Sequence, residues 1–334
     1  MKNWLLHLEK DTTPFIVIAT NQAGEWTGVA PFCRQTSVTL SKRIRLIGSG
    51  KACSDYLGLI CKEDNEDQFT TDVATFLQDL ANGSTNHSSF NLLELDGIRL
   101  DCRRTQKLLQ ALNSNGFQQT ALPLEGSWVA KLPESVDEFR SNMSKSMRRK
   151  VKEAAKRLDN ESTQVRSTTT DSFEELWPIF VDLHQQRREL LSQAGCFADS
   201  NFEHFLKNST LALIENGLAE LTVIEKDECP IASSLSLFNN DKWMLYQTGF
   251  DVRFQKESPG YQIVLQAVRT AIKRNFSEFD LLRGDEPYKA RWNTDRIELA
   301  KVRMTPPTAN AWVRNNLWNS AKSLKHFTNN LAAS

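Results

Sequence analysis

The stretch "SPGYQIVLQAVRTAIKRNFSEFDLL", residues 258–282, decides the fold because it predicts a helix that leads directly into a strand. Ser258 stands at the N-cap position, and Pro259 follows at the first helical position, where its missing N–H costs nothing. An apolar stripe at helical spacing comes next: Tyr261, Val264, Leu265, Val268 and Ile272. With the strand "EFDLL" behind it, this helix predicts a crossover unit of a mixed sheet.

The segments upstream of this helix predict antiparallel strands. In "AELTVIEKDECPIASSLSLF" (219–238), β-branched residues flank a charged turn, and "KWMLYQTGF" (242–250) supplies a third strand. The hairpin pattern occurs once more near the N-terminus, in "PFIVIATNQAGEWTGVAPF" (14–32). We therefore predict a mixed α/β protein built from a duplicated module, each copy a mostly antiparallel mixed sheet flanked by helices.

The chain has 334 residues, which suits two modest domains. We expect a first module over residues 1–125 and a second over 126–305. The opening helices of the first module are expected to be missing or reduced to "NWLLHLE", so that this module is incomplete or only supports the second. The second module would start with a helix at 144–158, which is rich in helix formers, and would end on the strand 296–304. Residues 306–334 predict a terminal amphipathic helix.

Composition excludes several classes of protein. Acidic and basic residues balance at 41 each, so no global field favours nucleic acid or an anionic membrane. Motifs for duplex DNA are absent, and the N-terminal apolar run is too short for a signal peptide or a membrane span. The six cysteines contain no CxxC pair, which favours reduced thiols, no metal site and a cytoplasmic location.

The start of the helix at 258 is a candidate anion site. The N–H groups of Gly260 and Tyr261 would face an anion with the helix dipole behind them, and glycine lets a phosphate approach closely. Gln255 and Lys256 would add side-chain donors. A well-capped helix that binds nothing fits the same residues.

The loop "LLRGDEPYKARWN" (281–293) packs charges at the end of the predicted strand. Asp285 or Glu286 could take a proton from an amine nucleophile, while Arg283 and Lys289 could neutralise phosphate or carboxylate. Two aromatic residues interleave with these charges and predict a partly enclosed pocket: Tyr288 and Trp292. The alternative is a surface loop of mutually paired charges.

Two further residues have both a chemical and a structural interpretation. The Tyr246 phenol, on the strand 242–250, could donate a proton to a leaving thiolate, or it could be a half-buried strand aromatic. His184 lies beside the apolar face of the predicted helix around 173–190; it is a candidate substrate contact or a satisfied core histidine.

Several segments together resemble one family: "MSKSMRRKVKEAAKRL", "FVDLHQQRRELLSQAGCFAD", "YQTGFDVRFQKESPGYQIVLQAV" and "FDLLRGDEPYKARWN". They are similar to the CelD-like (cellulose-biosynthesis-type) acetyltransferases of the GNAT superfamily, which are akin to Fem-type aminoacyltransferases. The resemblance covers roughly residues 130–305. It implies tandem GNAT-like modules, with pantetheine between two splayed strands near Tyr246 and pyrophosphate at 258–261. The loop "QKESPGYQ" has fewer glycines than the usual GNAT phosphate loop, so a rearranged contact is expected.

The function implied is a GNAT-like N-acyltransferase that moves an acyl group, acetyl in the first instance, from acyl-CoA to an amine. The acceptor would be an amino sugar or another polysaccharide-related precursor. Asp285 or Glu286 would act as base, Tyr246 as acid, and Lys289 with Arg283 as anchors. Two alternatives stay open: a Fem-type transferase using aminoacyl-tRNA, with the basic helix 145–157 on the RNA, or a catalytically idle scaffold in polysaccharide biosynthesis.

Overall fold

The computed structural model describes residues 2–8, 11–36, 42–190 and 192–316. The chain divides into two compact units. Among the described residues, the first unit takes those up to Leu124 and those from Glu298 onward, and the second takes Glu125–Ile297. Each unit contains one mixed sheet flanked by helices, which confirms the predicted mixed α/β class.

The first unit is built on a sheet with the strand order β1-β2-β3-β5-β14-β6, and β4 pairs with β2 beside this path. Its helices α2 and α3 pack together, and their apolar residues fill one core with those of the sheet. The elements are α1 (Lys2–His7), β1 (Thr12–Thr20), β2 (Trp26–Thr36), β3 (Lys42–Leu46), β4 (Ile60–Cys61), α2 (Glu66–Asn82), β5 (Leu92–Arg99), α3 (Arg103–Ser114), β6 (Gln118–Pro123) and β14 (Leu299–Thr305).

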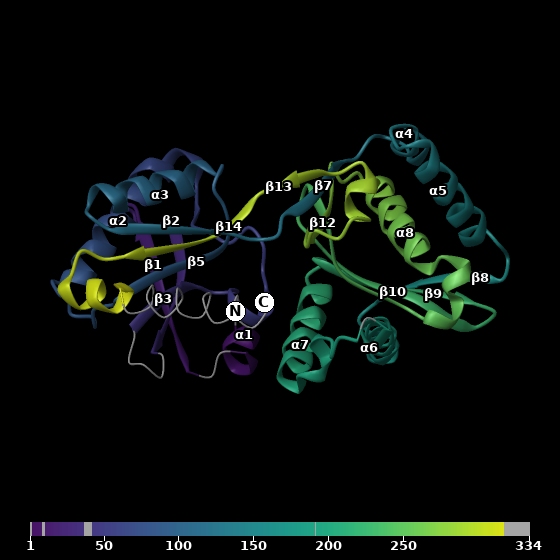
Figure 1. Ribbon diagram of the computed structural model, residues 1–334, viewed down its shortest axis with the longest axis horizontal. Coiled ribbons are helices and arrows are strands. Elements are labelled where there is room, and N and C mark those ends of the chain that lie inside the picture. The colour runs from purple at the N-terminus through teal and green to yellow at the C-terminus, as the bar shows by residue number, and fades with distance from the viewer. Residues whose placement is uncertain (1, 9–10, 37–41, 191, 317–334) are drawn as a thin grey trace, which may run out of the picture. The chain divides into compact units, whose positions relative to one another are not determined.

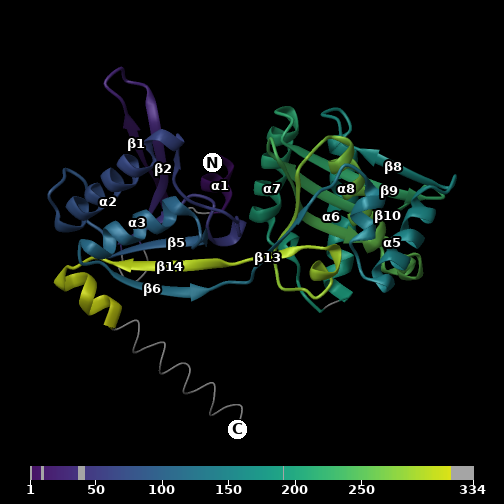
Figure 2. The same cartoon turned by 90° about the horizontal axis from the view of Figure 1, so that it is seen from above.

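The last strand differs from the prediction. We expected residues 296–304 to close the sheet of the second module, but only β13 (Asp295–Ile297) does so. β14 pairs antiparallel with both β5 and β6 and therefore lies inside the sheet of the first unit, as Figure 2 shows. The second unit is thus a continuous insertion into the first.

The second unit has the strand order β13-β7-β12-β11-β10-β9-β8. Figure 1 shows α4, α5 and α8 on one face of this sheet and α6 and α7 on the other. The elements are β7 (Ser127–Lys131), α4 (Val136–Ser141), α5 (Lys145–Leu158), β8 (Thr163–Ser167), α6 (Phe173–Leu190), α7 (Ser200–Glu215), β9 (Ala219–Lys226), β10 (Cys229–Phe238), β11 (Lys242–Phe250), α8 (Pro259–Lys273), β12 (Glu278–Arg283) and β13.

The same strand layout occurs in both units. In each, an antiparallel hairpin leads into a third strand, and a helix crosses over to a parallel partner: β3 pairs with β5, and β11 pairs with β12. A parallel pair needs such a crossover because its strands run in the same direction. The recurrence agrees with the duplicated hairpin pattern of the sequence.

Helix α8 is fixed between the sheet and α5 by its apolar residues. Val264, Leu265 and Val268 of the predicted stripe are buried in the core of the second unit. Burying each such side chain contributes about 1.5–3 kcal/mol, so the start of α8 is held firmly against the end of β11. Helix α5 begins at Lys145, where the Ser144 hydroxyl accepts the N–H of Met147, close to the predicted start.

The predicted terminal helix is present in part. Residues 309–316 are helical, and the rest of the predicted segment 306–334 lies outside the described residues. Within the described ranges, none of the helices combines the length and apolar character that a membrane crossing requires.

Candidate active site

The site begins where two parallel strands stop pairing. β11 and β12 are in register at three residue pairs, of which the last is Met244 with Asp280. β11 continues to Phe250, while β12 departs at Leu282, a residue with a left-handed backbone (φ 56°) whose N–H donates to the Asp280 carboxylate at 2.8 Å. Among the described residues the two strands form no further pair, and the sheet opens between them.

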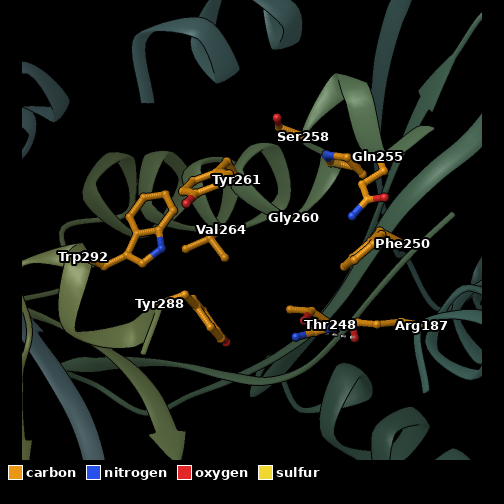
Figure 3. Close-up of a pocket in the computed structure, with 11 residues that line it drawn as sticks. Arg187, Thr248, Phe250, Gln255, Ser258, Gly260, Tyr261, Val264, Tyr288 and Trp292 are labelled. Atoms are coloured by element: carbon orange, nitrogen blue, oxygen red, sulfur yellow. Dashed lines mark hydrogen bonds between the residues drawn. The ribbon is translucent and has the colours of Figure 1, made fainter. Parts of the chain in front are cut away.

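A cavity of about 260 Å³ occupies this part of the second unit (Figure 3). The C-terminal half of β11, the loop into α8, the first turns of α8, the segment after β12 and one residue of α6 supply its walls. Most of the wall is aromatic or apolar, as is usual for sites that enclose an organic ligand. The lining residues are Arg187, Thr248, Phe250, Gln255, Ser258, Pro259, Gly260, Tyr261, Val264, Tyr288 and Trp292.

The start of α8 has a different conformation from the one predicted. Ser258 has a left-handed backbone (φ 55°, ψ 50°) and its side chain makes no capping bond. Its carbonyl accepts the N–H of Tyr261 at 3.0 Å and that of Gln262 at 3.3 Å. The Tyr261 N–H is therefore engaged and does not serve as the anion donor that the sequence predicted.

Gly260 keeps this end of the cavity open. A Cβ at Gly260 would meet only the ring of Phe250, at 3.8 Å, so the backbone here borders free space. The positive end of the α8 dipole lies at the same place, since the helix begins at Pro259. An anionic ligand group can reach the helix start along the Gly260 backbone.

Arg187 is a cavity residue that the sequence analysis did not single out. From α6 its Nη1 donates to the Thr248 hydroxyl at 2.6 Å and to the Thr248 carbonyl at 3.3 Å. The guanidinium carbon also lies 5.5 Å from the centre of the Phe250 ring. The position of Arg187 three residues after His184, on the turn of α6 that packs on β11, was the available signal.

Tyr288 brings a hydroxyl to the cavity wall. Its removal from water is the main cause that raises the pKa of the phenol above its ordinary value; the negative charge of Glu286 acts in the same direction, and Arg187 opposes it. The phenol is therefore protonated at neutral pH. A protonated hydroxyl on the wall of a ligand cavity can donate a proton.

The charged side chains of the loop after β12 interact mainly with the loop itself and with the end of the strand. The buried Lys289 donates from Nζ to the carbonyls of Leu282 (3.0 Å) and Arg283 (2.7 Å), and it lies 3.0 Å from the Glu286 carboxylate. Gly284 makes this possible: its φ of 129° disfavours other residues, and a Cβ there would lie 2.8 Å from the Lys289 Nζ. The Lys289 ammonium therefore binds the carbonyls at the end of β12 and does not line the cavity.

Asp285 also has a structural partner. Arg296 donates to both of its carboxylate oxygens, at 2.9 and 3.1 Å, and the Gly126 N–H lies 3.3 Å from Oδ1. These interactions, the Arg296 hydrogen bonds first, lower the pKa of Asp285. The lowered pKa makes the Asp285 carboxylate a weak proton acceptor. The Glu286 side chain pairs with Lys289 and is about half exposed (49%), so water reaches it.

The structure thus brings together only part of the predicted set. Six predicted residues line the cavity: Gln255, Ser258, Gly260, Tyr261, Tyr288 and Trp292. Seven do not: His184, Tyr246, Lys256, Arg283, Asp285, Glu286 and Lys289. Lys256 is exposed, and the pairing of β10 with β11 skips Tyr246, which places it at a strand bulge.

His184 belongs to the packing of α6 against β11. Its ring meets the ring of Phe197 edge-on, with the centres 5.0 Å apart, and its Nε2 lies 4.0 Å from the Cys196 Sγ. A Cβ at Gly249 would be 2.4 Å from the His184 backbone N, so helix and strand are in close contact here. Burial is the main cause that lowers the pKa of His184 to about 4.

This burial predicts a pH dependence of stability. The unfolded chain takes up a proton at His184 near pH 6.5, whereas the folded protein does so only near pH 4. The free energy of unfolding is therefore not reduced by this proton above pH 6.5. It falls by about 2–3 kcal/mol as the pH is lowered to 4, because only the unfolded chain binds the proton in this range. The free energy of unfolding, measured with urea, should no longer show this pH dependence in His184→Gln. It should still show it in His204→Gln, which changes an exposed histidine. Equal slopes for wild type and His184→Gln would contradict the assignment.

No group of histidine, cysteine and acidic side chains able to hold a metal ion occurs in the part of the chain that the structure describes. The six cysteines form no disulfide with one another.

Sequence and structure comparisons agree on the fold. Residues 142–290 match the family described as acetyltransferase (GNAT) domain. No match was found among curated proteins. The crystal structure of FemX is similar over 91% of this chain and 90% of its own, with a TM-score of 0.65 and 13% identity.

Two further solved structures have the same architecture. L-PGS from Bacillus licheniformis is similar over 89% of this chain and 84% of its own (TM-score 0.52, 10% identity). A tandem GNAT protein from the clavulanic acid biosynthesis pathway is similar over 91% and 86% (TM-score 0.50, 8% identity). The chain therefore has the fold of tandem GNAT-like proteins, and its second unit carries the part that matches the acetyltransferase (GNAT) domain.

Proposed function

We propose that the second unit is an N-acyltransferase that binds an acyl-CoA in the cavity between β11, α8 and Tyr288 and passes the acyl group to an amine. The observation that carries the proposal is this cavity: it lies where parallel strands separate, and the start of α8 closes one end. Its apolar walls suit a pantetheine chain, and the helix start at Gly260 suits its pyrophosphate. The GNAT match over residues 142–290 supports the same reaction class.

The chemistry needs one acid and one base. The amine nitrogen attacks the thioester carbonyl, a C–N bond forms and the C–S bond breaks. The leaving thiolate takes the proton of the Tyr288 phenol, which lines the cavity, in place of Tyr246, which does not. The proton lost by the amine passes through water to Glu286, because Asp285 is held by Arg296 with a lowered pKa.

The acceptor follows from the resemblance to CelD-like enzymes. We propose an amino sugar or another amine-bearing precursor of a polysaccharide. A set of such amines, with release of free CoA thiol as the readout, tests the acceptor separately from the donor.

Donor binding is the first test. Calorimetric titration with acetyl-CoA and longer acyl-CoAs should give saturable binding, and Gly260→Glu should weaken it by about tenfold or more because a carboxylate then stands at the helix start. Gln266→Glu places the same charge on α8 away from the cavity and should leave the affinity unchanged. If no acyl-CoA binds to the folded protein, the donor assignment fails and the idle-scaffold alternative gains support.

One observation favours a second donor, aminoacyl-tRNA. Helix α5 presents a row of exposed cations, and Lys150 among them donates to the Tyr261 hydroxyl at 3.2 Å, beside the cavity. The exposed cations are Lys145, Arg148, Arg149, Lys150, Lys152 and Lys156. Neutralising several tRNA phosphates would make affinity fall steeply with salt, so titration of aminoacyl-tRNA across salt concentrations separates the donors.

A further inference from the structure

A second cavity, of about 250 Å³, lies beside the loop that leads into α8. It shares no lining residue with the first cavity, and every residue around it is polar or charged. They come from the end of α5, the turn into β8 and its first residue, the end of β9, the loop before α8 and the first turn of α8. The lining residues are Lys156, Arg157, Asn160, Ser162, Thr163, Lys226, Glu257 and Gln262.

Positive charge dominates this second cavity. The Glu257 carboxylate lies between the Arg157 Nε, at 3.4 Å, and the Lys226 Nζ, at 3.2 Å. Lys156, whose Nζ is 3.6 Å from the Glu153 carboxylate, is a third cation on the wall. The side chains of Arg157 and Lys226 are about one third exposed, so both remain accessible to a ligand. Three cations and one carboxylate among the lining residues favour an anion and disfavour a metal ion.

The buried side chain of Gln262 places a second requirement on the ligand of this cavity. It is only 1% exposed, and its Nε2 donates to the Glu257 carbonyl at 2.9 Å. Its Oε1 has no hydrogen-bond partner among the described residues, although a buried acceptor left in this state costs about 1–3 kcal/mol. A ligand that donates a hydrogen bond, such as a hydroxyl, would satisfy this oxygen. The phosphate group of a dianionic monoester has no such donor, so the hydroxyl must belong to the rest of the molecule.

We propose that this cavity binds a small phosphate monoester that also carries hydroxyl groups, as a sugar phosphate or a ribonucleotide does. The phosphate lies against Arg157, Lys226 and Lys156, and a hydroxyl of the same molecule donates to the Gln262 Oε1. The site is additional to the proposed donor cavity and does not depend on acyl transfer, so it is testable by binding alone.

Calorimetric titration with glucose 6-phosphate, AMP, glucose and methyl phosphate tests the two requirements together, because methyl phosphate has no hydroxyl group outside its phosphate. We expect glucose 6-phosphate or AMP to bind about tenfold more tightly than glucose or methyl phosphate. Lys226→Met should weaken binding of that ligand by about tenfold. Gln262→Met, which keeps the chain length but lacks the oxygen, should weaken the same ligand and leave methyl phosphate unchanged. Lys273→Met, an exposed change at the end of α8 outside both cavities, is the matched control and should leave the affinities unchanged.

The relative affinities identify the class of ligand and show which results contradict the proposal. Tighter binding of AMP identifies a nucleotide, and tighter binding of glucose 6-phosphate identifies a sugar phosphate. Absence of binding by both glucose 6-phosphate and AMP overturns the proposal, as does an equal loss in Lys226→Met and Lys273→Met. Since Lys226 is partly exposed, its variant tests the phosphate contact even if the buried Gln262 variant does not fold.

Discussion

Tyr288→Phe is expected to lower turnover by about 10²- to 10⁴-fold and to leave the affinity for acyl-CoA within a few-fold of wild type. The phenol lines the cavity, and burial raises its pKa, so that it carries its proton at neutral pH. Phenylalanine keeps the ring and its contacts but has no proton for the leaving thiolate. Steady-state release of CoA thiol measures turnover, and calorimetry measures binding.

Tyr246→Phe is the matched control, because it removes the same hydroxyl from a strand residue that does not line the cavity. Turnover should change little in this variant. The opposite result, with Tyr246→Phe inactive and Tyr288→Phe active, would return the acid role to Tyr246, where the sequence pattern placed it.

Lys289→Met should destabilise the second unit by about 3–5 kcal/mol, the loss typical when one partner of a buried charged interaction is removed. Lys289 is 3% exposed, and its ammonium serves the carbonyls of Leu282 and Arg283, which would be left without that donor. Methionine keeps most of the volume, so the loss reports the hydrogen bonds. Urea unfolding followed by tryptophan fluorescence is suitable because Trp292 is buried in the same turn.

Lys152→Met removes a lysine from an exposed position and should change stability by no more than about 0.5 kcal/mol. A loss below about 1 kcal/mol for Lys289→Met would mean that water replaces the ammonium at the two carbonyls. Lys289 would then be available for the anchoring role that the sequence predicted.

Local sequence patterns predicted most elements of the second unit. The alternation around the turn 226–228 predicted β9 and β10, and the stripe on α8 predicted which face is buried. Both patterns depend on neighbouring residues alone. The conformation of Ser258 was not predictable in this way, because a serine before a helix usually caps it with its side chain, and here the backbone is left-handed instead.

The roles of the charged residues depend on partners far away along the chain. The sequence showed that Asp285 and Lys289 lie close together, but Asp285 is paired by Arg296 and by the N–H of Gly126, which is 159 residues away. Arg187 enters the cavity from α6, about 60 residues before the strand that it contacts. Spacing within a loop carries no information about such partners, so the cavity was predicted only in part.

The position of β14 between β5 and β6 determines the order in which the two units can fold during synthesis. A ribosome releases the chain from the N-terminus, so every residue of the second unit emerges before β14 is made. The second unit can close first, because β7 and β13, its first and last strands in chain order, pair directly, Ile297 opposite Ser127. Until β14 is made, β6 lacks the strand that it pairs with in the described part of the chain. A chain truncated after Ile297 would therefore keep both cavities of the second unit and leave the earlier-made sheet unfinished.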